Sequence, residues 1–98
     1  MLDIKKYIVN GRVEREKIAM DIKYLTITKN DLDILISNKE IREAFVGNEF
    51  SDKIPKSKWD KEYLDKLSYA VVAEGFNAEY LYYLNEVAEY VNKKRGNS

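Results

Sequence analysis

The sequence predicts an all-α domain, a small bundle of four to five helices whose C-terminal part is an antiparallel helical hairpin. Three observations lead to this fold class. Apolar residues recur at steps of three and four along most of the chain. Ser, Thr, Asn and Gly stand where these periodic stretches begin and end. The chain has 98 residues, of which 45% are hydrophobic and 35% charged, so residues 1–98 suffice for one core and form a single domain.

The first 28 residues contain two conflicting local patterns. Asn10-Gly11 stands between two short apolar stretches, which is a strong short-range indication of a β-hairpin. Residues 12–17, however, make a poor strand, and the apolar residues of 18–25 recur at helical spacing. We therefore expect two helices joined at Asn10-Gly11, with Gly11 ending the first, and keep a short β element in residues 1–28 as the alternative.

The middle of the chain contains two capping boxes. Segments 28–31 and 37–40 begin with Thr28 and Ser37 and have an acidic residue three positions later, the spacing of a reciprocal cap at a helix start. They predict two short helices, over residues 29–37 and 38–46. The following residues, 47–57, are the most loop-like part of the chain.

The first helix of the C-terminal hairpin is expected over residues 58–74. Ser57 and Asp60 have capping-box spacing just before it. Its apolar residues recur at steps of three and four, forming one stripe: Tyr63, Leu64, Leu67, Ala70 and Val71.

A three-residue corner, Gly75-Phe76-Asn77, joins this helix to a second one over residues 78–94. Gly75 can take the left-handed conformation that ends a helix, and Phe76 is then positioned to contact the first helix. Asn77 is a favourable N-cap for the second helix. The two helices therefore form an antiparallel hairpin.

The residue types that are missing exclude most catalytic chemistry. The chain has no cysteine and no histidine, so it has no disulfide, no thiolate ligand and no imidazole to act as general base or metal ligand. Its four glycines are too scattered to cradle a phosphate, and no carboxylates stand at metal-binding spacing. We expect a protein that is not an enzyme and that holds no cofactor or metal.

Hydropathy and residue usage indicate a cytoplasmic protein without membrane contact. No apolar run approaches the ~20 residues that span a bilayer, and the N-terminus lacks the apolar core of a signal peptide. Lys, Asn, Ile and Tyr are abundant, and their A/T-rich codons are typical of a bacterial or phage gene of that composition.

The basic residues support one alternative, a small DNA-binding transcriptional regulator that uses residues 28–61. Its two short helices over 28–46 resemble a helix-turn-helix in spacing. Glu40 and Glu43 in the second helix, and a formal net charge of +0, argue against this alternative, so nucleic acid is the less favoured partner. Four lysines near the loop are its candidate phosphate contacts: Lys53, Lys56, Lys58 and Lys61.

The stretch from residue 67 to residue 92 contains four glutamates and no lysine or arginine, a net charge of −4. On a helical wheel of its last helix, Tyr80 falls in the buried arc, whereas Tyr83 and Tyr90 fall at the edge of that arc. We therefore expect Tyr80 to be a core residue.

Tyr82 is different, because it projects from the middle of the polar face. Glu79, Glu86 and Glu89 surround it at spacings of −3, +4 and +7. Either the N-terminal half of the chain covers this ring, or the ring is exposed inside an acidic field. An exposed tyrosine supplies a large contact area and a hydroxyl at low entropic cost, as at interface hot spots.

We favour a non-catalytic protein-binding module that presents this face to a basic protein. Carboxylates attract a basic surface and pair with its Arg or Lys side chains. The concrete form is a small inhibitor, as an immunity or antitoxin-like protein covers the cationic cleft of a nuclease toxin. The expected contacts are Tyr82, Glu79, Glu86 and Glu89, with Tyr83 and Tyr90 at the rim.

A third alternative is a structural subunit of a homo- or hetero-oligomer. Tyr69 and Val72 point away from the apolar stripe of the first hairpin helix. They would then be buried at the contact with the N-terminal helices or with another subunit.

Overall fold

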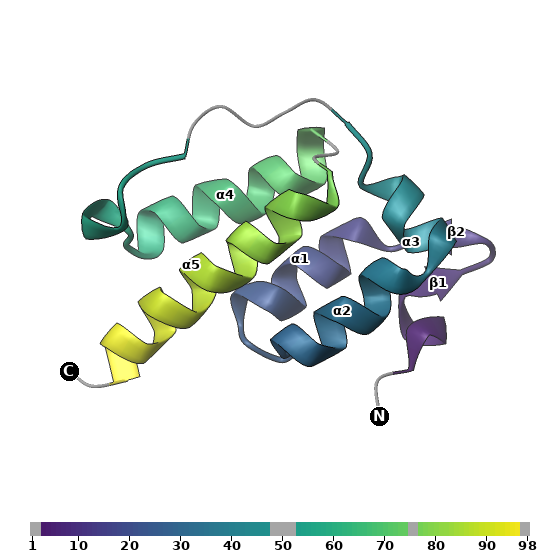
Figure 1. The fold of residues 1–98 in the computed structure, drawn as a ribbon, viewed down its shortest axis with the longest axis horizontal. Helices are drawn as coiled ribbons and strands as arrows, with labels where there is room; N and C mark the ends of the chain where they lie inside the picture. Colours follow the sequence, from purple (N-terminus) through teal and green to yellow (C-terminus); the bar gives the residue numbers. More distant parts are fainter. Residues whose placement is uncertain (1–2, 48–52, 75–76, 97–98) are drawn as a thin grey trace.

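The structure is a computed structural model that describes residues 3–47, 53–74 and 77–96. Within these ranges it contains five α-helices, two 3₁₀ helices and one two-stranded sheet, which confirms the all-α bundle with a minor β element (Figure 1). None of the described helices combines the length and the apolar character needed to cross a bilayer. In chain order the elements are η1 (Ile4–Tyr7), β1 (Ile8–Val9), β2 (Arg12–Val13), α1 (Arg15–Lys23), α2 (Lys29–Ser37), α3 (Lys39–Ala44), η2 (Lys56–Lys58), α4 (Lys61–Glu74) and α5 (Ala78–Gly96).

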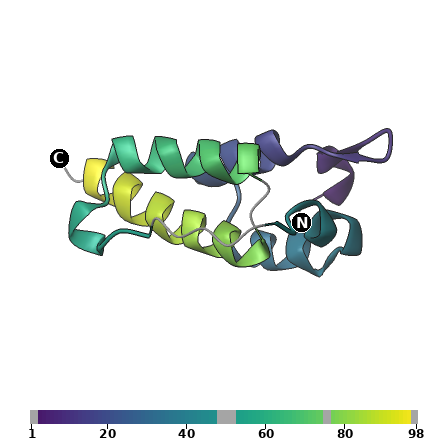
Figure 2. The same cartoon turned by 90° about the horizontal axis from the view of Figure 1, so that it is seen from above.

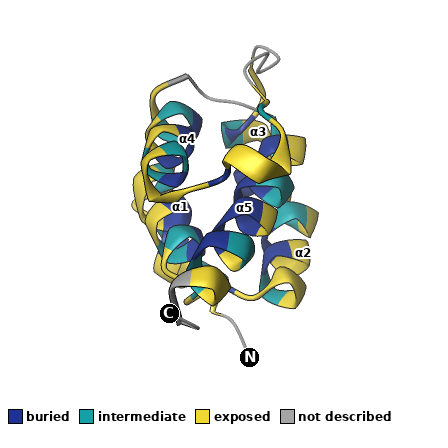
Figure 3. Ribbon diagram, turned by 90° about the vertical axis from the view of Figure 1, so that its left-hand side faces the viewer, coloured by how far each residue is buried: buried dark blue, intermediate teal, exposed yellow. Residues whose placement is uncertain are grey.

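The helices form two layers, which Figure 2 shows edge-on. Helices α1 and α4 lie in one layer, and α5 lies beside α2 in the other. Helix α5 contacts α1, α2 and α4 and is therefore the centre of the bundle. Seen along the bundle, the buried faces of the helices point inward (Figure 3). The core includes Tyr80, as expected, together with Ile18, Ile22, Leu32, Leu35, Leu67, Val71, Leu81, Leu84 and Val87.

The N-terminal segment forms a β-hairpin, so the expectation of two helices joined at Asn10-Gly11 is wrong and the β alternative is confirmed. The strands pair Ile8 with Val13 across the turn. Asn10 and Gly11 have φ values of 54° and 75°, the two positive angles that a tight two-residue hairpin turn requires and that Asn-Gly favours. The helical period begins only at α1.

Tyr7 attaches this hairpin to helix α1. Its side chain is buried, and its hydroxyl donates a hydrogen bond of 2.6 Å to Asp21 Oδ2. Burial, and then the Asp21 carboxylate, raise the pKa of Tyr7 well above its ordinary value. The Asp21 carbonyl also accepts bonds from the Thr26 backbone N–H and hydroxyl (2.8 and 2.9 Å), which hold the chain where Leu25 takes a rare left-handed φ of 59°.

The capping interactions in the middle of the chain confirm one expected helix and shift the other. Helix α2 spans the expected residues 29–37, and Thr28 Oγ1 caps its first turn at 3.2 Å. Helix α3, expected over 38–46, is shorter. Its cap is the Asn38 side chain, not Ser37, whose hydroxyl donates back into α2.

Helices α4 and α5 run antiparallel, which confirms the C-terminal hairpin (Figure 1). Helix α4 begins at Lys61 and not at residue 58. Its cap is Asp60, whose Oδ1 accepts a bond of 2.8 Å from the backbone of the first turn. Ser57 instead lies in η2.

Asn77 directly precedes α5, as expected, although its buried Oδ1 accepts no hydrogen bond from the described residues. The expected roles of Gly75 and Phe76 at this corner lie outside the described residues.

Candidate functional site

The polar face of helix α5 forms the floor of an open groove of about 360 Å³, termed here the α5 groove. Side chains from α2 and from the segment that precedes η2 complete its walls. The structure thus brings together five of the six expected partner-binding residues, with two lysines and one asparagine beside them. The lining residues are Lys29, Lys53, Glu79, Tyr82, Tyr83, Asn85, Glu86 and Glu89.

Tyr82 is half-buried, because helix α2 covers part of its ring. The ammonium of Lys29 lies 5.1 Å from the ring centroid, within the range of a cation–π contact. Burial, and then the Asp33 carboxylate, raise the pKa of the Tyr82 hydroxyl. Of the two situations considered for this ring, the N-terminal half does cover it in part, and the remaining edge faces the groove.

The three glutamates of the groove differ in their partners. Glu79 lies 3.7 Å from the ammonium of Lys53, an ion pair between two exposed side chains. Glu86 and Glu89 are exposed, and no basic side chain in the described parts of the chain lies within ion-pair distance of either. They are three residues apart on one helix, so they are neighbours and repel each other.

Tyr83 and Tyr90 hold the segment before α4 against α5. Trp59 is buried and meets both rings edge-on, with centroids 5.7 and 5.6 Å away. Its indole Nε1 donates a bond of 3.0 Å to the Ile54 carbonyl. Tyr83 therefore both lines the groove and supports this segment, and its hydroxyl lies 3.1 Å from that of Tyr63. Tyr90 is not brought into the groove.

Asn85 lines the same groove and was not among the expected site residues. The residue is 3% exposed, and its Nδ2 is buried without a hydrogen-bond partner among the residues that the structure describes. Burying an amide donor without an acceptor is unfavourable, and most proteins avoid it. One sequence signal could have identified it: position 85 stands between Leu81 and Ala88 at the spacing of the buried arc, where a polar residue is unusual.

Three of the four lysines of the nucleic-acid alternative are engaged within the chain. Lys53 pairs with Glu79, and Lys56 lies over the rings of Trp59 and Tyr90 at 5.7 and 5.2 Å. Lys61 lies 3.4 Å from the carboxylate of an acidic residue one helical turn later, on the same helix. These contacts reduce the positive charge available to a phosphate backbone.

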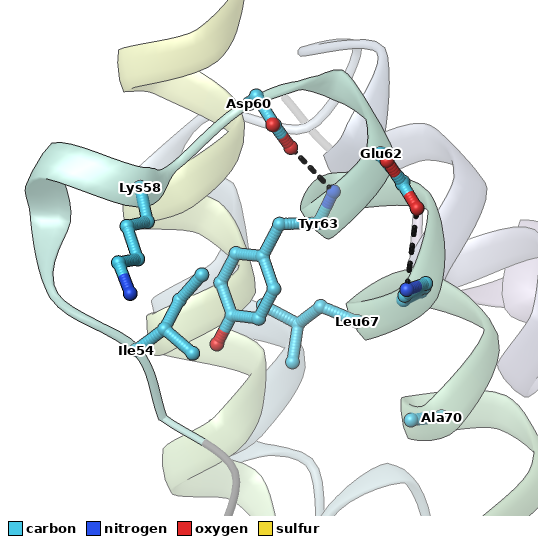
Figure 4. Close-up of a pocket in the computed structure, with 8 residues that line it drawn as sticks. Ile54, Lys58, Asp60, Glu62, Tyr63, Leu67 and Ala70 are labelled. Atoms are coloured by element: carbon cyan, nitrogen blue, oxygen red, sulfur yellow. Dashed lines mark hydrogen bonds and ion pairs between the residues drawn. The ribbon is translucent and has the colours of Figure 1, made fainter.

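Lys58 lies at the rim of a second groove, of about 460 Å³, which Figure 4 shows. The Tyr63 ring points into it beside Ile54 and Leu67, so its floor is apolar. Across the rim, Glu62 is paired with a lysine one turn later at 3.3 Å. This groove therefore offers an apolar floor and a partly neutralised rim.

A third groove, of about 400 Å³, lies between α1 and α4. Tyr69 is 76% exposed at its edge, beside the partly exposed Met20 and Val72. Lys23 and Asp65 form an ion pair across the two helices, and the Lys23 ammonium holds the pKa of Asp65 below its ordinary value. Tyr69 thus points away from the core, as the periodicity of α4 predicts, whereas Val72, expected to do the same, is partly buried and packs against the core.

Within the described residues, no group of three or more acidic, His or Cys side chains is arranged to hold a metal ion. Comparison with protein-family models, with curated proteins and with solved structures finds no match to this chain.

Proposed function

We propose that this protein is a non-catalytic binding module of the cytoplasm that uses the α5 groove to bind a basic protein. One observation carries the proposal: Glu86 and Glu89 are exposed, lack an intramolecular ion pair with any described residue, and lie beside the accessible edge of Tyr82. Acidic groups in this arrangement attract a positively charged surface and pair with its side chains.

The energetics favour a cationic occupant. Like charges at this helical spacing destabilise a helix by about 0.2–0.5 kcal/mol, and an Arg or Lys from a partner relieves that repulsion. Each exposed ion pair adds about 0.2–1 kcal/mol. The residues sit on the central helix of the bundle, so little ordering is needed when the partner binds.

The most concrete form of this function is an immunity or antitoxin-like inhibitor of a nuclease. A nuclease needs a cationic cleft to bind phosphates, and the exposed carboxylates of Glu86 and Glu89 are opposite in charge to such a cleft. The support for this form of the function is the charge of these exposed carboxylates.

Binding of a fluorescein-labelled tetra-arginine peptide, measured by fluorescence anisotropy at low salt, tests the proposal. Glu86→Gln with Glu89→Gln is expected to weaken binding by about tenfold, the loss of two ion pairs. Glu40→Gln with Glu43→Gln is the matched control, because these exposed glutamates on α3 have the same spacing and the same charge.

Equal weakening by both pairs would show that only net charge matters and would overturn the proposal. Salt-sensitive binding of duplex DNA that is lost in Lys53→Glu with Lys58→Glu would favour the DNA-binding regulator instead.

A subunit of a homo- or hetero-oligomer is a second candidate, and the exposure of Tyr69 beside Met20 and Val72 favours it. Tyr69→Lys is then expected to lower the molar mass measured by light scattering after size exclusion. A mass of one chain for the unchanged protein at high concentration would remove self-association.

A further inference from the structure

The buried amide of Asn85 indicates what kind of basic ligand the α5 groove takes. We propose that the occupant is an extended basic peptide segment. One of its main-chain carbonyls accepts a hydrogen bond from Asn85 Nδ2, and its Arg or Lys side chain lies against Glu86 and Glu89. This inference rests on the proposed function, because it specifies the ligand of the same groove.

Asn85 differs from two comparable polar side chains of this bundle, Ser68 and Asn92. Ser68, the other buried polar residue of the described chain, donates to the Leu64 carbonyl one turn earlier, at 2.8 Å. Asn92, also on α5, donates to the Ala88 carbonyl at 2.8 Å and to the end of helix α1 at 2.9 Å. The fold thus satisfies two comparable groups internally and leaves only the Asn85 donor without an acceptor among these three.

The arrangement of Tyr82, Asn85 and Glu89 on one helix determines which chemical groups the ligand must have. Asn85 lies three residues after Tyr82 and four before Glu89, so the three side chains are neighbours on the surface of α5. A ligand that satisfies all of them must bring a hydrogen-bond acceptor to Asn85 and a positive charge to Glu86 and Glu89.

This combination selects one chemical class. A metal ion or a polyamine brings positive charge but no acceptor for an amide N–H. A nucleic acid brings acceptors, but its negative charge opposes the glutamates. A peptide that contains arginine or lysine brings both, with the carbonyl and the cation a few bonds apart.

Two lysines of the chain show where such cations rest. Lys29 lies over the Tyr82 ring at 5.1 Å, and Lys53 lies over the Tyr83 ring at 5.2 Å and pairs with Glu79. Both lysine side chains are 44% exposed or more, so an incoming basic side chain can displace them. They occupy the ring faces but leave Glu86, Glu89 and the amide of Asn85 without a partner.

Isothermal titration calorimetry with two probes of equal charge tests the inference. Tetra-arginine peptide carries main-chain carbonyls, whereas spermine carries none. The peptide is expected to bind about tenfold more tightly than spermine. Asn85→Ala is expected to remove that advantage, weakening the peptide by about tenfold and leaving spermine unchanged. Ser68→Ala, the matched loss of a buried polar group outside the groove, is expected to change neither affinity.

The outcomes separate this inference from the proposed function. If the peptide is weakened by Glu86→Gln with Glu89→Gln but not by Asn85→Ala, the groove binds cations and the role of Asn85 is refuted. If neither variant weakens the peptide, the proposed function is refuted and this inference with it. Spermine that binds as tightly as the peptide also overturns the inference. Circular dichroism checks that each variant is folded. If Asn85→Ala does not fold, Asn85→Ser replaces it in the same titrations.

Discussion

Replacing Asn85 with alanine should stabilise the free protein, although the residue is 97% buried at the wall of the α5 groove. Its Nδ2 lost its hydration on folding and gained no acceptor from the described residues, which costs about 1–3 kcal/mol. Alanine removes that penalty and adds about 0.5 kcal/mol of helix propensity. Deleting the packed amide atoms costs about 1 kcal/mol through the space they leave. The sum is a gain of about 1 kcal/mol in the free energy of unfolding.

Urea denaturation is the appropriate assay, because the single tryptophan, Trp59, is buried and packs against α5. A gain of 1 kcal/mol corresponds to a rise in Tm of about 4–8 °C for a domain of this size. Ser68→Ala is the control, since Ser68 has the hydrogen bond that Asn85 lacks, and it should be neutral or lose up to about 1 kcal/mol. A clear loss of stability in Asn85→Ala, larger than in Ser68→Ala, would show that the amide is satisfied in the free protein and would refute the reasoning.

Four further predictions concern other contacts. Tyr7→Phe removes the hydroxyl that donates to the Asp21 carboxylate and should lower the free energy of unfolding at pH 7 by about 1.5–3 kcal/mol in urea, whereas Tyr69→Phe, exposed, should have little effect. The raised pKa of Tyr7 means that the folded protein keeps a proton that the unfolded chain releases near pH 10, so the free energy of unfolding should fall as the pH rises above about 10. This fall should be smaller in Tyr7→Phe, and an identical alkaline profile of the two proteins would contradict the prediction. Trp59→Ala should lower the free energy of unfolding by about 3–5 kcal/mol in thermal melts, because it removes a ring packed on Tyr83 and Tyr90, and a loss under about 1 kcal/mol would show that the segment before α4 is not held there. Lys53→Ala should tighten tetra-arginine binding by about threefold, because it frees Glu79 and the Tyr83 ring from an internal cation; weaker binding would show that this lysine supports the groove.

Local patterns predicted the fold well where a capping residue and an apolar period agree. Helix α2 has both, and its bounds were predicted to the residue. For helix α4 the sequence predicts a capping box of Ser57 and Asp60, but the cap in the structure is Asp60, and burial of Trp59 between the two accounts for the shift. Its ring must reach Tyr83 and Tyr90, so the chain makes a 3₁₀ turn first and α4 starts only after Asp60.

The N-terminal error has a similar cause. The helical spacing of apolar residues in 18–25 does correspond to a helix, but that helix is α1, and it does not extend back through Asn10-Gly11. Both turn residues have positive φ, which closes a two-residue hairpin and does not fit an α-helix. The turn pattern was therefore more informative than the helix propensity of the residues after it.

The candidate site was predictable as a face but not as a groove. A helical wheel places Glu79, Glu86 and Glu89 beside Tyr82, and the structure has them on one surface. The wheel does not identify the neighbour that lies over Tyr82, because that neighbour, α2, is about fifty residues earlier in the chain. Helix α2 covers part of the Tyr82 ring only because the two helices pack together in the folded chain, which a local sequence pattern cannot show.

The residues of α5 that depart from the most stable choice are concentrated in the groove. Asn85 is a buried donor without an acceptor, and Glu86 and Glu89 are neighbouring like charges without a cation from the described chain. Elsewhere on the same helix the choices favour stability, with Leu81, Leu84 and Val87 fully buried. A foldable sequence is locally consistent except where function opposes stability, so departures that lie within five residues of one helix are what the proposed binding surface predicts. One ligand with a carbonyl and a cation would correct all of them at once, which is why a basic peptide accounts for this groove better than a charge partner alone.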